Sequence, residues 1–351
     1  MLRIVHTGNE QQGSQTTQPG PSRTVTIDAM RWLVIASLIA ACGGSIDGGG
    51  DDDAPTDTAV VDPPVAAGCV DNVATGDHVY QCGGLKVDAR IPAACQGPGC
   101  GLILVLHGDT GNGLLMDDHI KMRDLGDQHG YVVIAPTGPP FGGSFPGSTW
   151  ETTNDATLVD IVGQVRDVFR VDPKRIHVTG FSRGGFVTWR LLCDHSDLFA
   201  SAAPAGAGVG TNFGEPTCFN QGRKPARDIP IVFMMGRTDT SVGYPQMQSI
   251  RDAAIAEYAA TGPVTVTSDQ SYRHDRWTGT GVVIETFDHA YETDDAGPFG
   301  AGGQFGDANG HCIAGSTSDP FAAQYAIPCV LPNSFVWGEE VIAFFQAHPL
   351  P

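Results

Sequence analysis

Runs of consecutive apolar residues alternate along the chain with longer segments in which apolar residues recur at helical spacing. The apolar runs are continuous and do not alternate with polar residues, which is typical of strands buried on both faces of a parallel sheet. Five such strands are expected, over 101–106, 131–134, 175–179, 231–235 and 282–287. Helices are expected over 158–169, 186–193, 250–258 and 339–346. This alternation predicts an α/β fold with a mostly parallel central sheet and helices on both faces.

A glycine-flanked serine follows the third expected strand. Residues 180–184 match the pattern G-x-S-x-G and stand between that strand and an expected helix, which is the context that a nucleophile elbow requires. Glycines two residues before and after Ser182 leave room for a tight turn that lifts the serine hydroxyl clear of the sheet. The sequence therefore predicts Ser182 as a nucleophile and the backbone N–H of Arg183 as one donor of an oxyanion hole.

A His-Gly turn leaves the first expected strand, upstream of the serine. Hydrolases with a nucleophile elbow place their second oxyanion donor on the loop that follows such a strand. We expect this donor to be the backbone N–H of Asp109, with that of Thr110 as the alternative. His107 is expected to be a structural hydrogen-bonding residue and not the catalytic base.

A serine nucleophile needs a base within reach and a carboxylate that orients the base. Asp239 follows the fourth expected strand and lies between the serine and the later histidines, the order that such a triad takes. Two histidines compete for the role of base, His289 and His311. We favour His311, because Gly310 gives the backbone freedom beside it and a disulfide expected just after it would pin the loop.

The composition limits the classes of function. The 351 residues include 20 Lys and Arg against 39 Asp and Glu, so the net charge is −19. Phosphate contacts need clustered basic side chains, so this acidic chain is a poor candidate for general nucleic-acid binding. The expected chemistry needs no metal and no organic cofactor. Trp150, Phe181 and Tyr244 are candidate acyl-pocket residues, although large aromatic side chains more often belong to a core.

The N-terminal part of the chain has the pattern of an export signal. An apolar run with one positive charge at its start ends in small residues just before Cys42. The four residues that end at this cysteine resemble a bacterial lipobox, in which the cysteine carries the lipid. We expect residues 1–42 to be an extension and lipoprotein signal with its true start at Met30, and 43–68 to be a flexible Gly-, Asp- and Pro-rich linker. Residues 69–351 would form the catalytic domain, lipid-anchored at the bacterial cell envelope or secreted.

The cysteines also indicate export. Nine are present, and setting aside Cys42 leaves an even number. An even set in an exported chain suggests disulfides, although spacing alone does not choose among the many pairings. We expect neighbours in sequence to pair: Cys69–Cys82, Cys95–Cys100, Cys193–Cys218 and Cys312–Cys329.

Three segments resemble a known family. Residues 171–185, 106–108 and 235–242 are similar to the elbow, oxyanion and acid segments of the polyhydroxybutyrate depolymerase and feruloyl esterase family, which are secreted α/β-hydrolases. Family members often have an aromatic residue and a proline after the catalytic histidine, and here Cys312 follows His311.

The resemblance implies a triad of Ser182, Asp239 and His311 that acts on carboxylic esters. Feruloyl or acetyl esters of plant cell walls and hydroxyalkanoate oligomers are the implied substrates. Two alternatives stay open, because fold does not fix function. One is a serine peptidase or acyltransferase on the same fold, and the other is a surface protein without catalytic activity.

Overall fold

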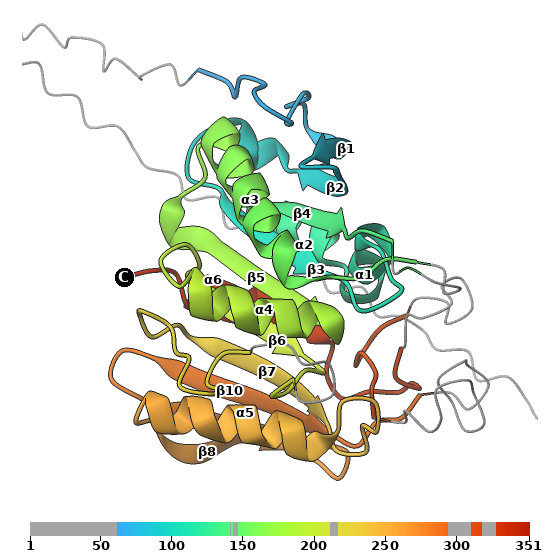
Figure 1. Cartoon of the computed structure of the whole chain (residues 1–351), viewed down its shortest axis with the longest axis vertical. Coiled ribbons are helices and arrows are strands. Elements are labelled where there is room, and N and C mark those ends of the chain that lie inside the picture. Colours follow the sequence, from blue (N-terminus) through green and yellow to red (C-terminus); the bar gives the residue numbers. More distant parts are fainter. Residues whose placement is uncertain (1–61, 141, 143–146, 211–216, 294–309, 318–327) are drawn as a thin grey trace, which may run out of the picture. The chain divides into compact units, whose positions relative to one another are not determined.

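The computed structural model in Figure 1 describes residues 62–140, 142, 147–210, 217–293, 310–317 and 328–351. The expected export signal, Cys42 and the expected linker up to residue 61 lie outside these residues. Within the described ranges, no helix has both the length and the apolar character that crossing a membrane requires.

A ten-stranded mixed sheet forms the centre of the protein (Figure 1). Its middle strands are parallel, in the spatial order β4 (Tyr131–Thr137), β3 (Gly101–Leu106), β5 (Ile176–Phe181), β6 (Ser201–Ala205), β7 (Ile231–Gly236) and β10 (Val283–His289). Antiparallel strands extend it at both ends: β2 (Leu85–Ile91) and β1 (Gly76–Cys82) beside β4, and β9 (Tyr272–Thr278) and β8 (Thr261–Ser268) beside β10. The parallel centre confirms the predicted fold class, and all five expected strands are present.

The flanking strands and β6 were not predicted from the pattern of apolar runs. Five of the seven residues of β1 are partly or fully exposed, and β8 is exposed along its whole length, so neither strand shows the pattern of a buried apolar run. β6 consists only of Ser, Ala and Pro, small residues that give little hydrophobic signal. The continuous-run criterion finds buried strands made of large apolar residues, and it overlooks strands with exposed residues and buried strands made of small ones.

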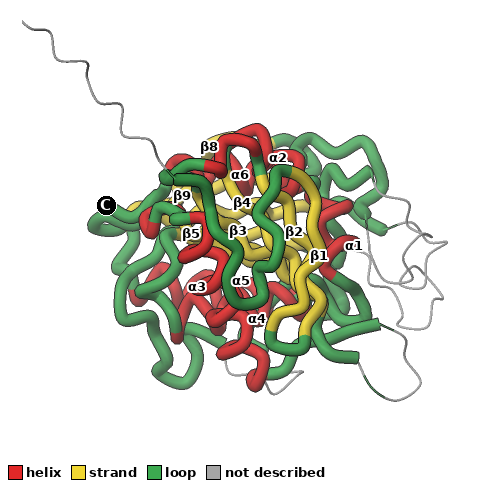
Figure 2. Tube along the Cα trace, turned by 90° about the horizontal axis from the view of Figure 1, so that it is seen from above, coloured by secondary structure: helices red, strands yellow, loops and turns green. Residues whose placement is uncertain are grey.

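Helices cover both faces of the sheet (Figures 1 and 2). On one face lie α3 (Asp155–Phe169), α4 (Arg183–Asp194) and α5 (Tyr244–Glu257), and on the other α1 (Gly113–Ile120), α2 (Met122–His129) and α6 (Trp337–Ala347). Short 3₁₀ helices occupy Ala93–Gln96, Thr152–Asn154 and Pro173–Arg175. Two helices were not predicted, α1 and α2, which are eight residues each and meet at Lys121, a residue in the left-handed conformation.

β3 shows why its apolar run is continuous. Leu102 and Leu104 pack in the core on the α3 and α4 side of the sheet, whereas Ile103 and Val105 pack in the core on the α1 and α6 side. All four are fully buried. Each such side chain stabilises the fold by about 1.5–3 kcal/mol relative to an exposed position. Both layers of helices are therefore held by the same strand.

Residues 62–68, the described part of the expected linker, contact the domain through Asp62. The Arg170 guanidinium donates to the Asp62 carbonyl. The Cys69 N–H donates to Gln164 Oε1 at 2.9 Å. The first contact joins the linker to the residue that follows α3, and the second joins the start of the expected domain to α3 itself.

Four disulfides close short loops, and they join the pairs that the sequence analysis expected: Cys69–Cys82, Cys95–Cys100, Cys193–Cys218 and Cys312–Cys329. A disulfide typically stabilises a fold by about 2–4 kcal/mol, mainly by restricting the unfolded chain. The last pair follows His311 directly and matters for the site described next.

Candidate active site

Ser182 occupies a strained turn between β5 and α4. Its backbone has φ 55° and ψ −119°, a positive φ that is uncommon for a residue other than glycine. The flanking glycines are required by contact: a Cβ on Gly180 would collide with the Gly184 carbonyl, and one on Gly184 would collide with the Leu106 carbonyl. Strain of this kind costs about 1–3 kcal/mol and is typical of functional sites. The turn therefore has the form of a nucleophile elbow.

Asp239 and His311 form a buried acid–base pair. His311 Nδ1 donates to Asp239 Oδ2 at 2.6 Å, and both side chains are buried. The other carboxylate oxygen accepts the backbone N–H groups of Ser241 and Val242, at 2.8 and 3.0 Å. Burial opposes ionisation of Asp239, but the charge and hydrogen bond of His311 and the two N–H groups outweigh it and lower its pKa. An ionised carboxylate on Nδ1 leaves Nε2 of His311 for a second partner.

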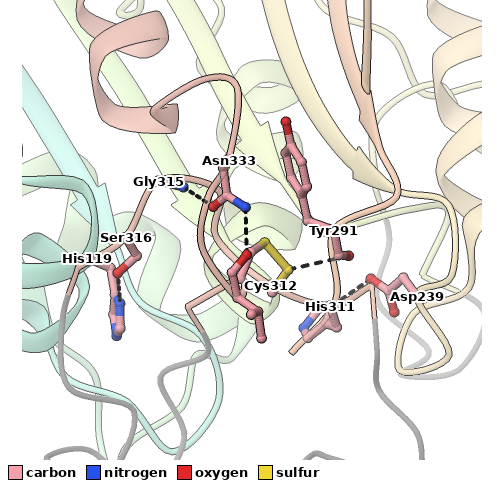
Figure 3. Close-up of a disulfide and its surroundings, with 10 residues drawn as sticks. His119, Asp239, Tyr291, His311, Cys312, Gly315, Ser316 and Asn333 are labelled. Carbon is pink, nitrogen blue, oxygen red and sulfur yellow. Dashed lines mark hydrogen bonds and ion pairs between the residues drawn. A yellow bond between two sulfur atoms is a disulfide. The ribbon is translucent and has the colours of Figure 1, made fainter. Parts of the chain in front are cut away.

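The loop that carries His311 is fastened from several sides (Figure 3). Gly310 packs so closely on the backbone of Thr238 and Asp239 that a Cβ would not fit there. The Cys312–Cys329 disulfide follows at once. The Gly315 N–H then donates to Asn333 Oδ1 at 2.7 Å.

One further contact ties this loop to the other side of the site. His119 on α1 contacts the Ser316 hydroxyl through Nδ1 at 2.7 Å (Figure 3). Because α1 follows the expected oxyanion loop in sequence, the contact links the helix after that loop with the segment that carries His311.

The serine and the histidine converge on the start of the loop after β6. The Ser182 N–H donates to the Ala205 carbonyl at 2.9 Å. A Cβ on the next residue, Gly206, would stand 3.2 Å from His311 Cε1 and 2.9 Å from the ring of Phe181. The ring centroids of Phe181 and His311 lie 4.7 Å apart. Among the described residues, no hydrogen bond yet joins Ser182 Oγ to His311, and catalytic hydrogen bonds are often longer without substrate.

The structure does not give His289 the same surroundings. It is the last residue of β10 and its side chain is 1% exposed. Burial lowers its pKa to about 4, so the imidazole is neutral. Its ring stacks on Tyr291, with 5.4 Å between ring centroids, and it forms no hydrogen bond with Asp239 in the described part of the chain. Of the two candidate bases, the structure thus joins only His311 to the carboxylate.

The expected oxyanion loop contacts the nucleophile. A Cβ on Gly108 would lie 3.2 Å from Ser182 Cβ, so the loop backbone passes directly beside the serine. The Thr110 N–H donates to the Ser148 carbonyl at 2.6 Å, which gives the alternative donor a partner within the protein. The Asp109 carboxylate accepts the Thr149 hydroxyl and lies 3.8 Å from Arg183 Nε. The side chains of the two expected oxyanion residues therefore face each other.

Hydrogen bonds of the His107 and Trp150 side chains hold the backbone of this loop in place. The Gly138 N–H donates to His107 Nε2 at 3.0 Å, so Nδ1 carries the proton and donates to the Gly108 carbonyl at 2.6 Å. Burial lowers the pKa of His107 to about 4, which keeps this tautomer neutral. Trp150 Nε1 donates to the His107 carbonyl at 2.9 Å. His107 has the structural role that the sequence analysis expected.

The three candidate pocket aromatics have different surroundings. Trp150 is fully buried in the core, so it does not line an accessible pocket, and that expectation is corrected. Its indole N–H holds the His107 carbonyl, and nothing in the sequence around a single tryptophan in a loop predicts such a contact. Tyr244 donates through its hydroxyl to Asp288 Oδ2 at 2.7 Å, and its role in a pocket stays a prediction. Phe181 is the one that contacts His311.

One group of side chains has the residue types of a metal site. The ligand atoms of His289, Cys312 and Cys329 all lie within 4.8 Å of one another. The two sulfur atoms are bonded to each other in the disulfide, so neither is a thiolate ligand. We assign no metal to this group.

The sheet order, the strained serine after β5 and the acid–base pair beyond β7 together define the class of α/β-hydrolases. Comparison with protein families agrees: the model described as the alpha/beta hydrolase family matches residues 103–326. The chain belongs to this family.

Curated relatives share parts of the chain. It is 29% identical over 154 residues to a bifunctional acetylxylan esterase/xylanase from Neocallimastix patriciarum, over 43% of this chain and 21% of that protein. It is 30% identical over 132 residues to a poly(3-hydroxybutyrate) depolymerase from Ralstonia pickettii, over 33% of this chain and 25% of that protein. The matches thus span about a quarter or less of these two relatives. Among solved structures, an acetyl xylan esterase from Aspergillus awamori has 18% identity and a TM-score of 0.44, over 58% of this chain and 89% of that one.

Proposed function

We propose that the protein is a serine esterase that hydrolyses carboxylic esters through an acyl-enzyme. The hydrogen bond between His311 and the buried Asp239, beside the strained turn of Ser182, is the observation that carries this proposal. The relatives named as esterases and depolymerases support the same class of reaction.

The first half of the reaction forms the acyl-enzyme. Ser182 Oγ attacks the ester carbonyl carbon, and His311 Nε2 takes the serine proton. Asp239 holds the imidazole in the tautomer that accepts at Nε2 and stabilises the imidazolium that forms. The backbone N–H groups of Arg183 and Asp109 stabilise the oxyanion, and one such donor contributes about 2.7–4 kcal/mol to lowering the barrier. The first half ends when the tetrahedral intermediate collapses: the bond between the acyl carbon and the alkoxide oxygen breaks, His311 gives its proton to that oxygen, and the alcohol departs from the acyl-enzyme.

The second half releases the acid. A water molecule then attacks the acyl carbon while His311 takes its proton, and the bond to Ser182 Oγ breaks as the serine is reprotonated. Both halves use the same charges and donors, so no other group is required.

The variant Ser182→Ala tests the nucleophile. Its kcat on p-nitrophenyl acetate is expected to fall by about 10⁴-fold or more, because removing the nucleophile leaves only the rest of the site. Wild type, and not the variant, should be labelled by a fluorophosphonate. Ser249→Ala, which removes an exposed hydroxyl on α5, is the matched control and should keep full activity. Full hydrolysis by Ser182→Ala would refute the mechanism.

For the substrate, we propose small acyl groups on carbohydrate, or hydroxyalkanoate oligomers. The names of the relatives and the resemblance of the motifs support this choice. Acetylated xylan, feruloylated sugars and hydroxybutyrate oligomers, compared with matched amides, separate the candidates. Faster turnover of the amides would favour a peptidase, and transfer of the acyl group to an added alcohol in place of water would favour an acyltransferase.

We further propose that the protein is exported and anchored by lipid at Cys42. The four disulfides support an oxidising compartment, and the apolar run before Cys42 supports the anchor. In a bacterial host, Cys42→Ser should lose incorporation of labelled palmitate and leave the membrane fraction. Unchanged labelling would exclude Cys42 as the lipid site.

A further inference from the structure

The Asp109 carboxylate stands between two separate parts of the chain. On one side it accepts the hydroxyl of Thr149. On the other it lies 3.8 Å from Arg183 Nε, with the Arg183 side chain 12% exposed and that of Asp109 27% exposed. The proposed mechanism uses only the backbone N–H of Asp109, so it leaves this arrangement of side chains unexplained.

Each partner of the carboxylate is itself fixed. Arg183 Nε donates to the Trp150 carbonyl at 2.7 Å, and the Trp150 indole donates to the His107 carbonyl at 2.9 Å. The Thr149 N–H donates to the Pro139 carbonyl at 2.9 Å. The hydrogen bonds therefore run from the elbow, through the segment around Thr149, back to the oxyanion loop.

The loop needs such fixing because its own backbone is bent. Thr110 has φ 64°, in the left-handed region that residues other than glycine rarely adopt. Its N–H is held by the Ser148 carbonyl at 2.6 Å. The direction of the Asp109 N–H thus depends on the contacts that hold Asp109 and its neighbour Thr110.

We propose that Arg183 and Thr149 are positioning residues of the oxyanion hole, which hold the Asp109 carboxylate and so aim the Asp109 N–H at the ester oxygen. Arg183 then serves both donors: its backbone N–H acts directly, and its side chain acts through Asp109. The proposal rests on the proposed function, and it adds a role for side chains that do not touch the substrate.

The expected effect is on the transition state and not on substrate binding. Oxyanion donors act by being fixed in place before charge develops, and a misplacement of about 1 Å in a site costs up to about 10²-fold in rate. Loss of either positioning residue should therefore lower kcat by about 10–100-fold. KM should change little, because the ground-state carbonyl relies less on these donors.

The test compares Thr149→Val, Thr149→Ser and Arg183→Ala with wild type. Thr149→Val keeps the shape of the side chain and removes the hydroxyl, whereas Thr149→Ser restores a hydroxyl and is the matched control. Values of kcat and KM on p-nitrophenyl acetate are measured together with inhibition by phenylboronic acid, whose tetrahedral serine adduct places an oxygen in the oxyanion hole. Fluorophosphonate labelling counts the folded, competent sites, and rates are expressed per labelled site.

We expect Thr149→Val and Arg183→Ala to lose kcat and boronate affinity in parallel while KM stays unchanged. Thr149→Ser should stay close to wild type in all three quantities. Values of kcat and boronate affinity within twofold of wild type in Thr149→Val would overturn it, even if Arg183→Ala does not fold. A higher KM with unchanged kcat would also overturn it, since the residues would then bind substrate. A wild-type protein that neither hydrolyses the ester nor reacts with the fluorophosphonate would instead reject the proposed function.

Discussion

The two sides of the candidate site are held in place by different means. On the base side, Asp239 binds His311 directly and accepts two backbone N–H groups on its other oxygen, and the Cys312–Cys329 disulfide follows His311 at once. On the oxyanion side, the loop after β3 is held by side chains from the segments around Trp150 and Arg183. The base side therefore depends on a histidine–carboxylate hydrogen bond and a covalent bond, and the oxyanion side on a chain of hydrogen bonds that includes the Asp109–Arg183 ion pair.

This difference determines how each side should respond to change. A base and the carboxylate that orients it act as a unit, and the unit fails when the base is removed. Several hydrogen bonds together hold the oxyanion loop, so the loss of one of them shifts the Asp109 N–H without removing it. Larger effects on rate are expected from the base side.

The largest effect is expected from His311→Ala. Its kcat on p-nitrophenyl acetate should fall by about 10⁴-fold or more, because Ser182 loses its base. His289→Ala is the matched variant on the same side of the sheet, and it should lower stability while the rate per labelled site stays within tenfold of wild type. A large loss of rate in His289→Ala with little loss in His311→Ala would reverse the assignment of the base.

A smaller effect is expected when the Cys312–Cys329 bridge is replaced by two serines. Unfolding should become easier by about 2–4 kcal/mol in a urea titration. The kcat should also fall, by roughly tenfold, because the loop that carries His311 loses its covalent tether.

Serines in place of Cys95 and Cys100 provide the control for this experiment. That bridge closes a loop of sequence separation 5 beside the start of β3, so its loss should reduce stability without changing kcat. An equal fall of kcat in both double variants would mean that the bridge beside His311 has no specific effect on the base.

The smallest expected effect is a loss of folding stability at acidic pH. Burial lowers the pKa of His107 and of His289 to about 4, one imidazole on each side of the site. A folded-state pKa below the unfolded value of 6.5 means that folding favours the neutral ring, so this stability is complete above pH 6.5 and declines as pH falls toward 4. The contribution of each ring to the free energy of unfolding should be about 2 kcal/mol smaller at pH 5 than at pH 7.5.

Urea titrations at the two pH values measure this loss. His289→Gln should reduce the difference between them by about the share of one ring, because glutamine does not titrate. A difference that is the same in wild type and variant would show that His289 does not contribute to the acid sensitivity.

Five of the six parallel strands of the sheet were predicted because they are buried on both faces and their apolar runs are continuous, whereas β6, which has only small residues, was not. It predicted the serine turn because the glycines on either side of Ser182 are required by backbone contacts that no side chain can replace. Asp239 and His311 were predicted from their order after the serine and their position after strands, and the structure joins them by a hydrogen bond.

Other features had no local signal. The edge strands β1 and β8 have exposed residues, and the pattern of a buried strand is absent from them. The role of Trp150 depends on a carbonyl 43 positions away in sequence, and an aromatic residue in a loop looks the same whether it lines a pocket or braces a backbone. Contacts between side chains and distant backbone groups follow from the fold and cannot be derived from spacing.

The left-handed backbone at Ser182 has a consequence for how this protein evolves. Glycine adopts that conformation without steric penalty, so a chain selected only for resistance to heat would tend to replace the serine. A copy of the gene released from its catalytic duty should therefore lose this hydroxyl early and melt at a higher temperature afterwards. A serine at a position that favours glycine therefore places a hydroxyl at the cost of stability.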